Sequence, residues 1–213
     1  MKKIWLLLAA MGLLLTACGA PAPVQPSSQP ETTVETGAEI ESETAAPVTE
    51  PAASDTLVLY FSATGNTRRV AQTLAEITDA DLLELQPAQP YTDADLDYHD
   101  DNCRANREMQ DDTARPELSG DLGDLASYGT IYLGYPIWWG TAPRIIETLL
   151  DQYDLSGSTI YLFCTSGSSG IEQSRSDLET AYPDLHIAGA RRFSAQADAA
   201  ELQDWVADRN EEN

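Results

Sequence analysis

The sequence predicts an α/β fold in which a five-stranded parallel sheet carries helices on both faces. Short apolar runs alternate along residues 55–213 with stretches whose apolar residues recur at helical spacing. This alternation is typical of a doubly wound parallel sheet. The run at 57–61 is continuously apolar rather than alternating, which indicates a strand buried on both faces.

Five short apolar runs are the predicted strands, at 57–61, 82–85, 130–133, 159–164 and 185–187. Helical spacing marks the segments between them, where the recurring apolar residues are Val70, Ala71, Leu74 and Ile77; Ile145, Ile146, Leu149 and Leu150; and Ile171, Leu178 and Tyr182. Asp198 and Glu201 form a capping-box pair ahead of a C-terminal helix. The long connection 86–128 holds a further predicted helix around 105–112.

Residues 1–17 are predicted to be a signal peptide. Lys2 and Lys3 precede an apolar run at 4–15, which is shorter than the roughly 20 residues of a membrane-spanning helix. The small residues before Cys18 resemble the lipobox of bacterial lipoproteins, which implies that Cys18 is lipidated and begins the mature chain. An ordinary signal peptide cleaved near Ala17 and an uncleaved anchor stay open. We therefore expect export, with a lipid anchor in the outer face of the cell membrane.

Residues 18–54 are predicted to be a disordered, acidic linker, and residues 55–213 the folded domain. The linker is rich in Pro, Ser, Thr, Ala and Glu and has too few large apolar residues to bury a core. Prolines stiffen such a chain locally and its like charges extend it. We expect it to act as a spacer between the lipid and the domain.

The chain is strongly acidic, with 12 Lys and Arg against 35 Asp and Glu and a net charge of −23. Proteins that bind nucleic acids present basic surfaces to the phosphates. Nucleic acid is therefore excluded as a natural partner. An acidic surface suits steering toward a basic protein, although solubility alone would also account for it.

Small polar residues follow the first predicted strand and end at the start of a helix. They are Ser62, Thr64, Gly65, Asn66 and Thr67. Backbone N–H groups at a helix N-terminus have no intrahelical acceptor and attract anions, so this loop is a candidate phosphate site. It has neither the Lys of a P-loop nor the three glycines of a dinucleotide fingerprint, which favours a single terminal phosphate. A capped helix start without a ligand is the alternative.

Two further loops follow predicted strands and should lie at the same edge of the sheet, where open α/β sheets bind ligands. The loop after the third strand carries aromatic rings that could stack on a flat heterocycle, and its candidate residues are Pro136, Ile137, Trp138 and Trp139. The loop after the fourth strand is rich in N–H and hydroxyl donors, and its candidate residues are Thr165, Ser166, Gly167 and Ser168. A core plug or a protein interface would equally explain the aromatic loop.

The three loops read SATGNT, GYPIWWG and CTSGSSG, and together they resemble the loops of the flavodoxin family, over residues 55 to about 208. The resemblance implies strand order 2-1-3-4-5 and FMN as the cofactor. It implies that residues 62 and 64–67 contact the phosphate, 136–139 wall the isoalloxazine ring, and 165–168 lie at its polar edge. Two features depart from the family: Ser62 stands where many members have Thr, and an export signal is present. The export signal puts the partner in doubt, not the cofactor.

The function expected from the resemblance is electron transfer through FMN, between redox partner proteins or small-molecule electron donors and acceptors. The alternative is an enzyme, an FMN-dependent NAD(P)H, quinone or small-molecule oxidoreductase. A domain of this fold that has lost FMN is a third possibility, which the intact loops disfavour. No residue stands out as a catalytic acid or base, because His99 and His186 suit surface or packing positions and Arg144 suits a helix start.

The remaining ionisable residues and cysteines leave two questions open. The acidic residues between 93 and 101 lack the order of an EF-hand loop, so we expect a solvated acidic face rather than a metal site. Cys103 and Cys164 could form a disulfide outside the cytoplasm, or remain as one buried and one exposed thiol.

Overall fold

A computed structural model describes residues 54–211 of this chain. The predicted signal peptide, Cys18 and the linker up to residue 53 lie outside the described residues, and the predictions made for them stay predictions. Within residues 54–211, every helix is too short or too polar to cross a membrane.

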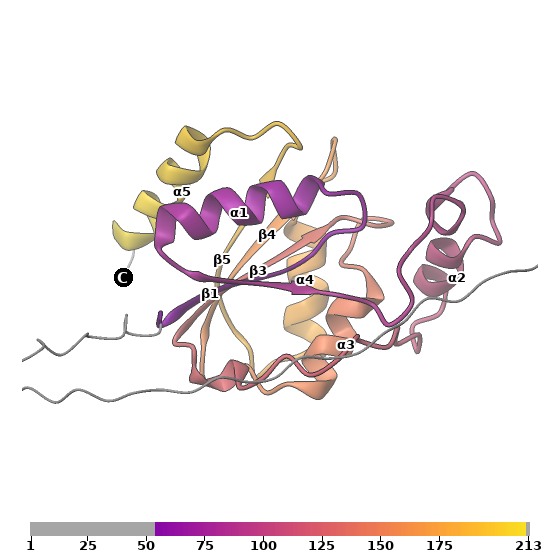
Figure 1. The fold of residues 1–213 in the computed structure, drawn as a ribbon, viewed down its shortest axis with the longest axis horizontal. Helices are drawn as coiled ribbons and strands as arrows, with labels where there is room; N and C mark the ends of the chain where they lie inside the picture. Colours follow the sequence, from indigo (N-terminus) through magenta and orange to yellow (C-terminus); the bar gives the residue numbers. More distant parts are fainter. Residues whose placement is uncertain (1–53, 212–213) are drawn as a thin grey trace, which may run out of the picture. The chain divides into compact units, whose positions relative to one another are not determined.

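The sheet has five parallel strands in the order β2-β1-β3-β4-β5 (Figure 1), as the resemblance implied. Their bounds are β1 Thr56–Phe61, β2 Asp81–Leu85, β3 Thr130–Pro136, β4 Thr159–Thr165 and β5 His186–Phe193. The order places β1 beside β3, with the switch in winding direction between them. In such sheets, ligands bind outside the carboxyl ends of the strands at this switch.

The described chain has five α-helices, α1 Asn66–Thr78, α2 Arg104–Gln110, α3 Arg144–Gln152, α4 Glu172–Ala181 and α5 Ala199–Glu211, and all but α2 cover the sheet. α1 and α5 pack on one face, and α3 and α4 pack on the other (Figure 1). Short 3-10 helices at Ala94–Leu96 and Leu125–Ser127 flank α2 in the long connection between β2 and β3. That connection reaches the carboxyl-end edge of the sheet, where it helps to form the candidate site.

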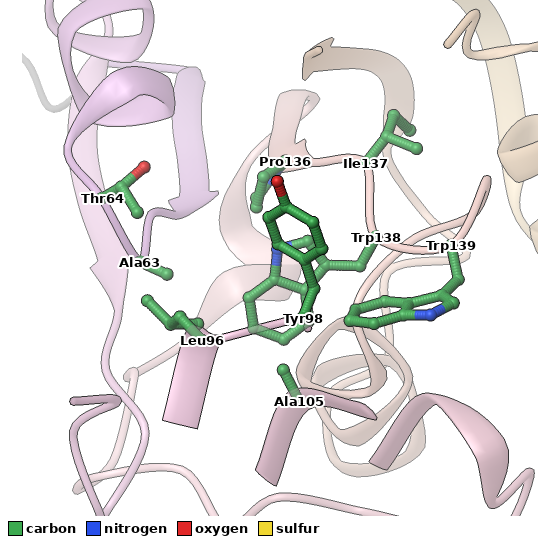
Figure 2. Close-up of a pocket in the computed structure, with 9 residues that line it drawn as sticks. All are labelled: Ala63, Thr64, Leu96, Tyr98, Ala105, Pro136, Ile137, Trp138 and Trp139. Carbon is green, nitrogen blue, oxygen red and sulfur yellow. The ribbon is translucent and has the colours of Figure 1, made fainter. Parts of the chain in front are cut away.

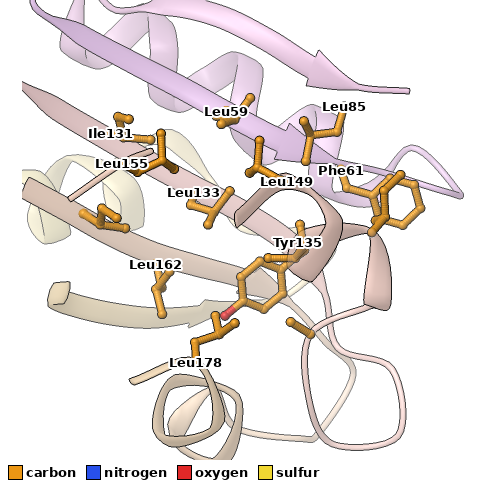
Figure 3. Close-up of a cluster of buried hydrophobic side chains, with 14 of the residues drawn as sticks. Leu59, Phe61, Leu85, Ile131, Leu133, Tyr135, Leu149, Leu155, Leu162 and Leu178 are labelled. Carbon is orange, nitrogen blue, oxygen red and sulfur yellow. The ribbon is translucent and has the colours of Figure 1, made fainter. Parts of the chain in front are cut away.

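The two faces of the sheet bury two separate apolar cores. Leu59 and Phe61 of β1 join the core under α3 and α4 (Figure 3), whereas Val58 and Tyr60 join the core under α1 and α5. All these β1 residues are at most 3% exposed. The continuously apolar run therefore forms a strand buried on both faces, as predicted.

The structure corrects several predicted bounds. β3 runs to Pro136 rather than ending at Leu133, and β4 runs to Thr165, so these two predicted loop residues end strands. β5 runs to Phe193 rather than ending at Ile187, because it pairs with β4 along its whole length to Thr165. The two arginines before Phe193 interrupt the apolar run and hide the strand in the sequence. α2 begins at Arg104 after an N-cap by Cys103, whose sulfur accepts a hydrogen bond from the Asn106 N–H at 3.3 Å. By contrast, the predicted cap of α5 is present, since the Asp198 carboxylate accepts the Glu201 N–H at 3.0 Å.

Candidate functional site

A cavity of about 470 Å³ opens at the carboxyl ends of β1 and β3 (Figure 2). Three segments far apart in the sequence line it, and their residues are Ala63 and Thr64; Leu96, Tyr98 and Ala105; and Pro136, Ile137, Trp138 and Trp139. The volume lies within the range of pockets that hold small organic ligands and cofactors. The lining is mostly apolar, which suits the body of a flat ring rather than its charged groups.

The β1–α1 loop, whose Ala63 and Thr64 line this cavity, is the candidate anion site. Gly65 precedes α1 with φ of +84°, a conformation that glycine adopts without strain. The first N–H groups of α1, from Asn66 onward, have no intrahelical acceptor. Within the described chain, the buried Ser62 hydroxyl oxygen has no hydrogen-bond partner. A buried hydroxyl without a partner is costly, so its presence beside free N–H groups indicates a site for an anion.

Thr67 and Thr165 lie together, but their hydroxyl groups bond to each other. The two oxygens are 2.8 Å apart, and the residues are only 1% and 5% exposed. These side chains therefore join the start of α1 to the end of β4. Thr64 is exposed, and its hydroxyl accepts a hydrogen bond from the Asn66 side-chain amide at 3.2 Å.

A tight turn at Trp138–Thr141 projects an aromatic wall into the cavity. Trp138 and Thr141 exchange two backbone hydrogen bonds of 3.0 Å each. The two residues between them have positive φ, +49° at Trp139 and +87° at Gly140, as in a type I′ turn. Positive φ is uncommon for an aromatic residue and persists only where the surroundings hold it. Trp139 is 51% exposed, so the turn keeps a large ring in contact with solvent at the cavity mouth.

Trp138 is held from behind by an aromatic cluster. Its ring centroid is 5.7 Å from that of Phe61 and 5.2 Å from that of Tyr91, both with edge-on geometry. The Arg104 guanidinium lies 4.1 Å from the centre of the Tyr91 ring, and the Tyr91 hydroxyl donates to the Glu108 carboxylate. Burial, reinforced by Glu108, raises the pKa of Tyr91. Tyr91 therefore stays neutral and braces the wall from the β2–β3 connection.

The β2–β3 connection supplies the wall of the cavity that sequence reasoning missed. Leu96, Tyr98 and Ala105 line the cavity, and Tyr98 is 67% exposed. The buried Asn106 side chain holds this segment by donating to the Tyr98 and Asp100 carbonyls, at 3.3 and 2.6 Å.

The acidic residues of this connection are arranged as a solvated face, since Asp93, Asp97, Asp100 and Asp101 are exposed. The aromatic and aliphatic residues set among these acids were the available signal for the missed wall. The prediction of a solvated acidic face therefore described only part of this segment.

The β4–α4 loop lies next to the cavity without lining it. The Ile137 N–H donates to the Thr165 carbonyl at 3.1 Å, which ties the loop to the aromatic turn. Ser166, Gly167 and Ser168 follow Thr165 and leave the sheet, and none of them lines the cavity. The Ser168 N–H donates to the Ser166 hydroxyl at 3.2 Å. The loop therefore lies beside the aromatic turn, and the contact of residues 165–168 with a ligand stays a prediction.

The two histidines, Arg144 and the two cysteines do not line the cavity, although the His99 ring lies 4.1 Å from that of the lining residue Tyr98. His99 and His186 are exposed, and Arg144 begins α3 as predicted, where it pairs with Glu147 and Asp112.

Cys103 and Cys164 are both free and buried, so no disulfide joins them, and the expectation of one exposed thiol is wrong. Burial raises the pKa of the Cys164 thiol to about 12. Within residues 54–211, no His, Cys, Asp and Glu side chains gather in threes to hold a metal ion.

Comparisons with known proteins agree with this geometry. The sequence model of a family described as flavodoxin matches residues 55–209. A solved structure of a protein assigned as a flavoprotein, from Bacteroides uniformis, is 45% identical with a TM-score of 0.70, and the match covers 73% of this chain and 99% of that one. A flavoprotein from Lactobacillus acidophilus, solved in complex with FMN, is 29% identical with a TM-score of 0.57 and is matched over 99% of its length and 72% of this chain. A comparison with curated protein sequences finds no match.

Proposed function

Because this chain belongs to the flavodoxin family, we propose that it binds FMN at the described site and carries electrons through it. The L. acidophilus relative, which was solved with FMN, supports this choice of cofactor. The chemistry that FMN supplies when bound is the acceptance and release of electrons. The protein's part is to hold the cofactor, shield its ring and set its potential.

The residues present fit the two ends of FMN. At the β1–α1 loop, the free N–H groups at the start of α1 and the Ser62 hydroxyl would hold the phosphate. At the cavity, Trp138 and Trp139 would wall the isoalloxazine ring. Neutral donors rather than lysines bind a single phosphate in this scheme, which agrees with the lack of any Lys after Lys3.

The observation that carries the proposal is the Ser62 hydroxyl. It is a buried oxygen without a partner in the described chain, and it lies directly between the strand that feeds the cavity and the helix N-terminus. A phosphate oxygen at this position would accept its proton in a hydrogen bond and remove the cost of its burial.

The visible absorption spectrum of the purified protein tests the proposal. The protein, in mild detergent, is incubated with FMN and desalted. We expect flavin absorption to survive desalting in the wild type and to be lost in the double variant Thr64→Ala/Asn66→Ala. Thr73→Ala, which changes a threonine farther along the same helix, is the matched control and should keep the flavin. A colourless wild type that also fails to bind FMN in titration would overturn the proposal.

The same preparation separates an electron carrier from an FMN-dependent NAD(P)H or quinone oxidoreductase. A carrier is reduced and reoxidised by added redox agents without turning over NADH or NADPH with a quinone. Steady oxidation of the nicotinamide, with a rate that follows protein concentration, would assign the enzyme instead. The natural redox partner, whether a protein or a small molecule, then follows from the agents that exchange electrons fastest.

We further propose that the protein works outside the cytoplasm, tethered through a lipid on Cys18. The support is the sequence around Cys18 and the linker that follows it. Cells grown with labelled palmitate should incorporate label into the wild type and not into Cys18→Ser. Cys103→Ser is the control, and it should label like the wild type. Label that persists in Cys18→Ser would place the lipid elsewhere, and a wild type without label would exclude the lipid anchor.

A further inference from the structure

The β4–α4 loop is held by an arginine that has no carboxylate partner. Arg192, near the end of β5, donates from one terminal nitrogen to the Ser166 carbonyl at 3.0 Å and to the Gly167 carbonyl at 2.9 Å. Among the described residues, no carboxylate forms an ion pair with it, and its Nε atom is buried without an acceptor. In a chain with 35 acidic residues, a half-buried guanidinium left without a carboxylate calls for an explanation.

The hydrogen bonds of Arg192 fix the orientation of the loop's peptide groups. In a trans peptide the C=O of one residue and the N–H of the next point in opposite directions. Since the Ser166 and Gly167 carbonyls point to Arg192, the Gly167 and Ser168 N–H groups point away from it. The Ser168 N–H is taken by the Ser166 hydroxyl, and the Gly167 N–H has no acceptor in the described chain.

The absence of a side chain at Gly167 is a second observation that suits a ligand at this part of the loop. Its φ lies outside the left-handed region, and a Cβ placed on it would meet no atom within 4 Å. The fold itself therefore does not require glycine here. A residue without a side chain, beside a free N–H that points outward, suits a ligand that approaches the backbone closely.

We propose that Arg192 is a positioning residue for the flavin, an inference that rests on the proposed FMN binding. Arg192 directs the free Gly167 N–H toward the polar edge of the ring and places a positive charge behind that edge. When the ring is reduced it carries more negative charge at this edge, so both effects favour reduced over oxidised FMN. Arg192 thus raises the flavin potential in a protein whose other charges lower it.

The neighbouring arginine offers a matched control. Arg191 lies on the opposite face of the sheet, where its guanidinium is 3.8 Å from the Asp208 carboxylate of α5 and makes no bond to the β4–α4 loop. Glu172, at the start of α4, is a carboxylate of the same region, and it forms no ion pair with Arg192 in the described chain. Replacing Arg191 removes the same charge from the same strand without releasing the loop.

The test compares Arg192→Met, Arg192→Lys and Arg191→Met in the full-length protein. Two quantities are measured, the Kd for oxidised FMN by titration and the potential by equilibration with a reference dye that delivers its electrons to the bound flavin. We expect Arg192→Met to bind reduced FMN about tenfold more weakly relative to oxidised FMN, which lowers a two-electron potential by about 30 mV. Arg192→Lys keeps the charge and should restore most of this loss, and Arg191→Met should resemble the wild type.

Two results would overturn the proposal while leaving FMN binding intact. In one, Arg192→Met shows the potential of Arg191→Met. In the other, Arg192→Lys lowers the potential as much as Arg192→Met does, which would assign Arg192 to packing alone. If Arg192→Met does not fold, as judged by circular dichroism, Arg192→Lys and Arg191→Met decide. A lysine variant whose potential lies well below that of Arg191→Met would then refute a role of the charge. A wild type that binds no FMN would overturn this inference together with the proposed function.

Discussion

The two ends of the candidate site are built in different ways. The phosphate end is a single run of residues, 62–67, whose donors are mostly backbone N–H groups at the start of α1. The ring end is assembled from three segments far apart in the chain, and aromatic side chains hold them together around Trp138. The first depends on local conformation, and the second depends on tertiary packing.

This difference predicts how each end responds to change. A loop that binds through its main chain can lose one side chain and keep its shape, so a substitution there should affect binding more than folding. A wall that is also part of the core cannot be trimmed without loss of stability, because Trp138 packs on Phe61, which is 1% exposed. The predictions below test this contrast.

The largest expected effect is at the ring end. Trp138→Ala should lower the free energy of unfolding of the apoprotein by about 3 kcal/mol, because it empties the space between Phe61 and Tyr91. Trp139→Ala should change it by less than about 0.5 kcal/mol, since Trp139 is half-exposed. Urea unfolding of the two variants measures the difference. Equal losses of unfolding free energy would show that the exposed and the packed tryptophan contribute equally to stability. That result would contradict the proposed difference between the two ends of the site.

The next effect is at the phosphate end, where one substitution should weaken FMN binding without lowering the stability of the apoprotein. Ser62→Ala removes a buried hydroxyl without a partner, so the apoprotein should be as stable as the wild type or about 1 kcal/mol more stable. FMN should bind about tenfold more weakly, because a hydrogen bond to the phosphate is lost. Riboflavin, which has the ring and no phosphate, is the control ligand, and its Kd should not change. An equal loss for riboflavin would move Ser62 away from the phosphate.

The smallest effect concerns Tyr91, which braces the ring end. Its pKa is raised above the ordinary value of 10.0 by burial and by Glu108. Above pH 10 the unfolded chain therefore loses a proton that the folded protein keeps, and the free energy of unfolding falls as pH rises. Tyr91 alone should contribute a fall of about 1 kcal/mol between pH 10 and 11. Urea unfolding at several pH values should show a shallower fall in Tyr91→Phe, and an unchanged slope would mean that Tyr91 ionises freely in the folded state.

The contrast between the ends also explains what the sequence could predict. The phosphate loop and the aromatic turn follow directly from apolar strands, so residues such as Gly65 and Trp139 were found by their place after β1 and β3. Tyr98 was missed because it lies among exposed aspartates in the β2–β3 connection, and only the folded chain brings it to the cavity. Local patterns identify donors at strand ends, but not a wall that a long connection supplies.

Side-chain pairing was equally out of reach of the sequence. Thr67 and Thr165 were each expected to contact the ligand, yet their hydroxyls are 2.8 Å apart and bond to each other. The two residues are 98 positions apart, and their meeting depends on the packing of α1 against the end of β4. The sequence could not predict the role of Arg192 for the same reason, since its hydrogen bonds join β5 to the β4–α4 loop.

The turn that carries Trp139 has a consequence for how fast a ligand can bind. Its two backbone hydrogen bonds join Trp138 and Thr141 of the turn itself, so the conformation that presents the exposed ring does not depend on contacts with a ligand. Complex formation then has no slow conformational step at this wall. The observed association rate should rise in proportion to ligand concentration without reaching a plateau, as expected when encounter alone sets the pace.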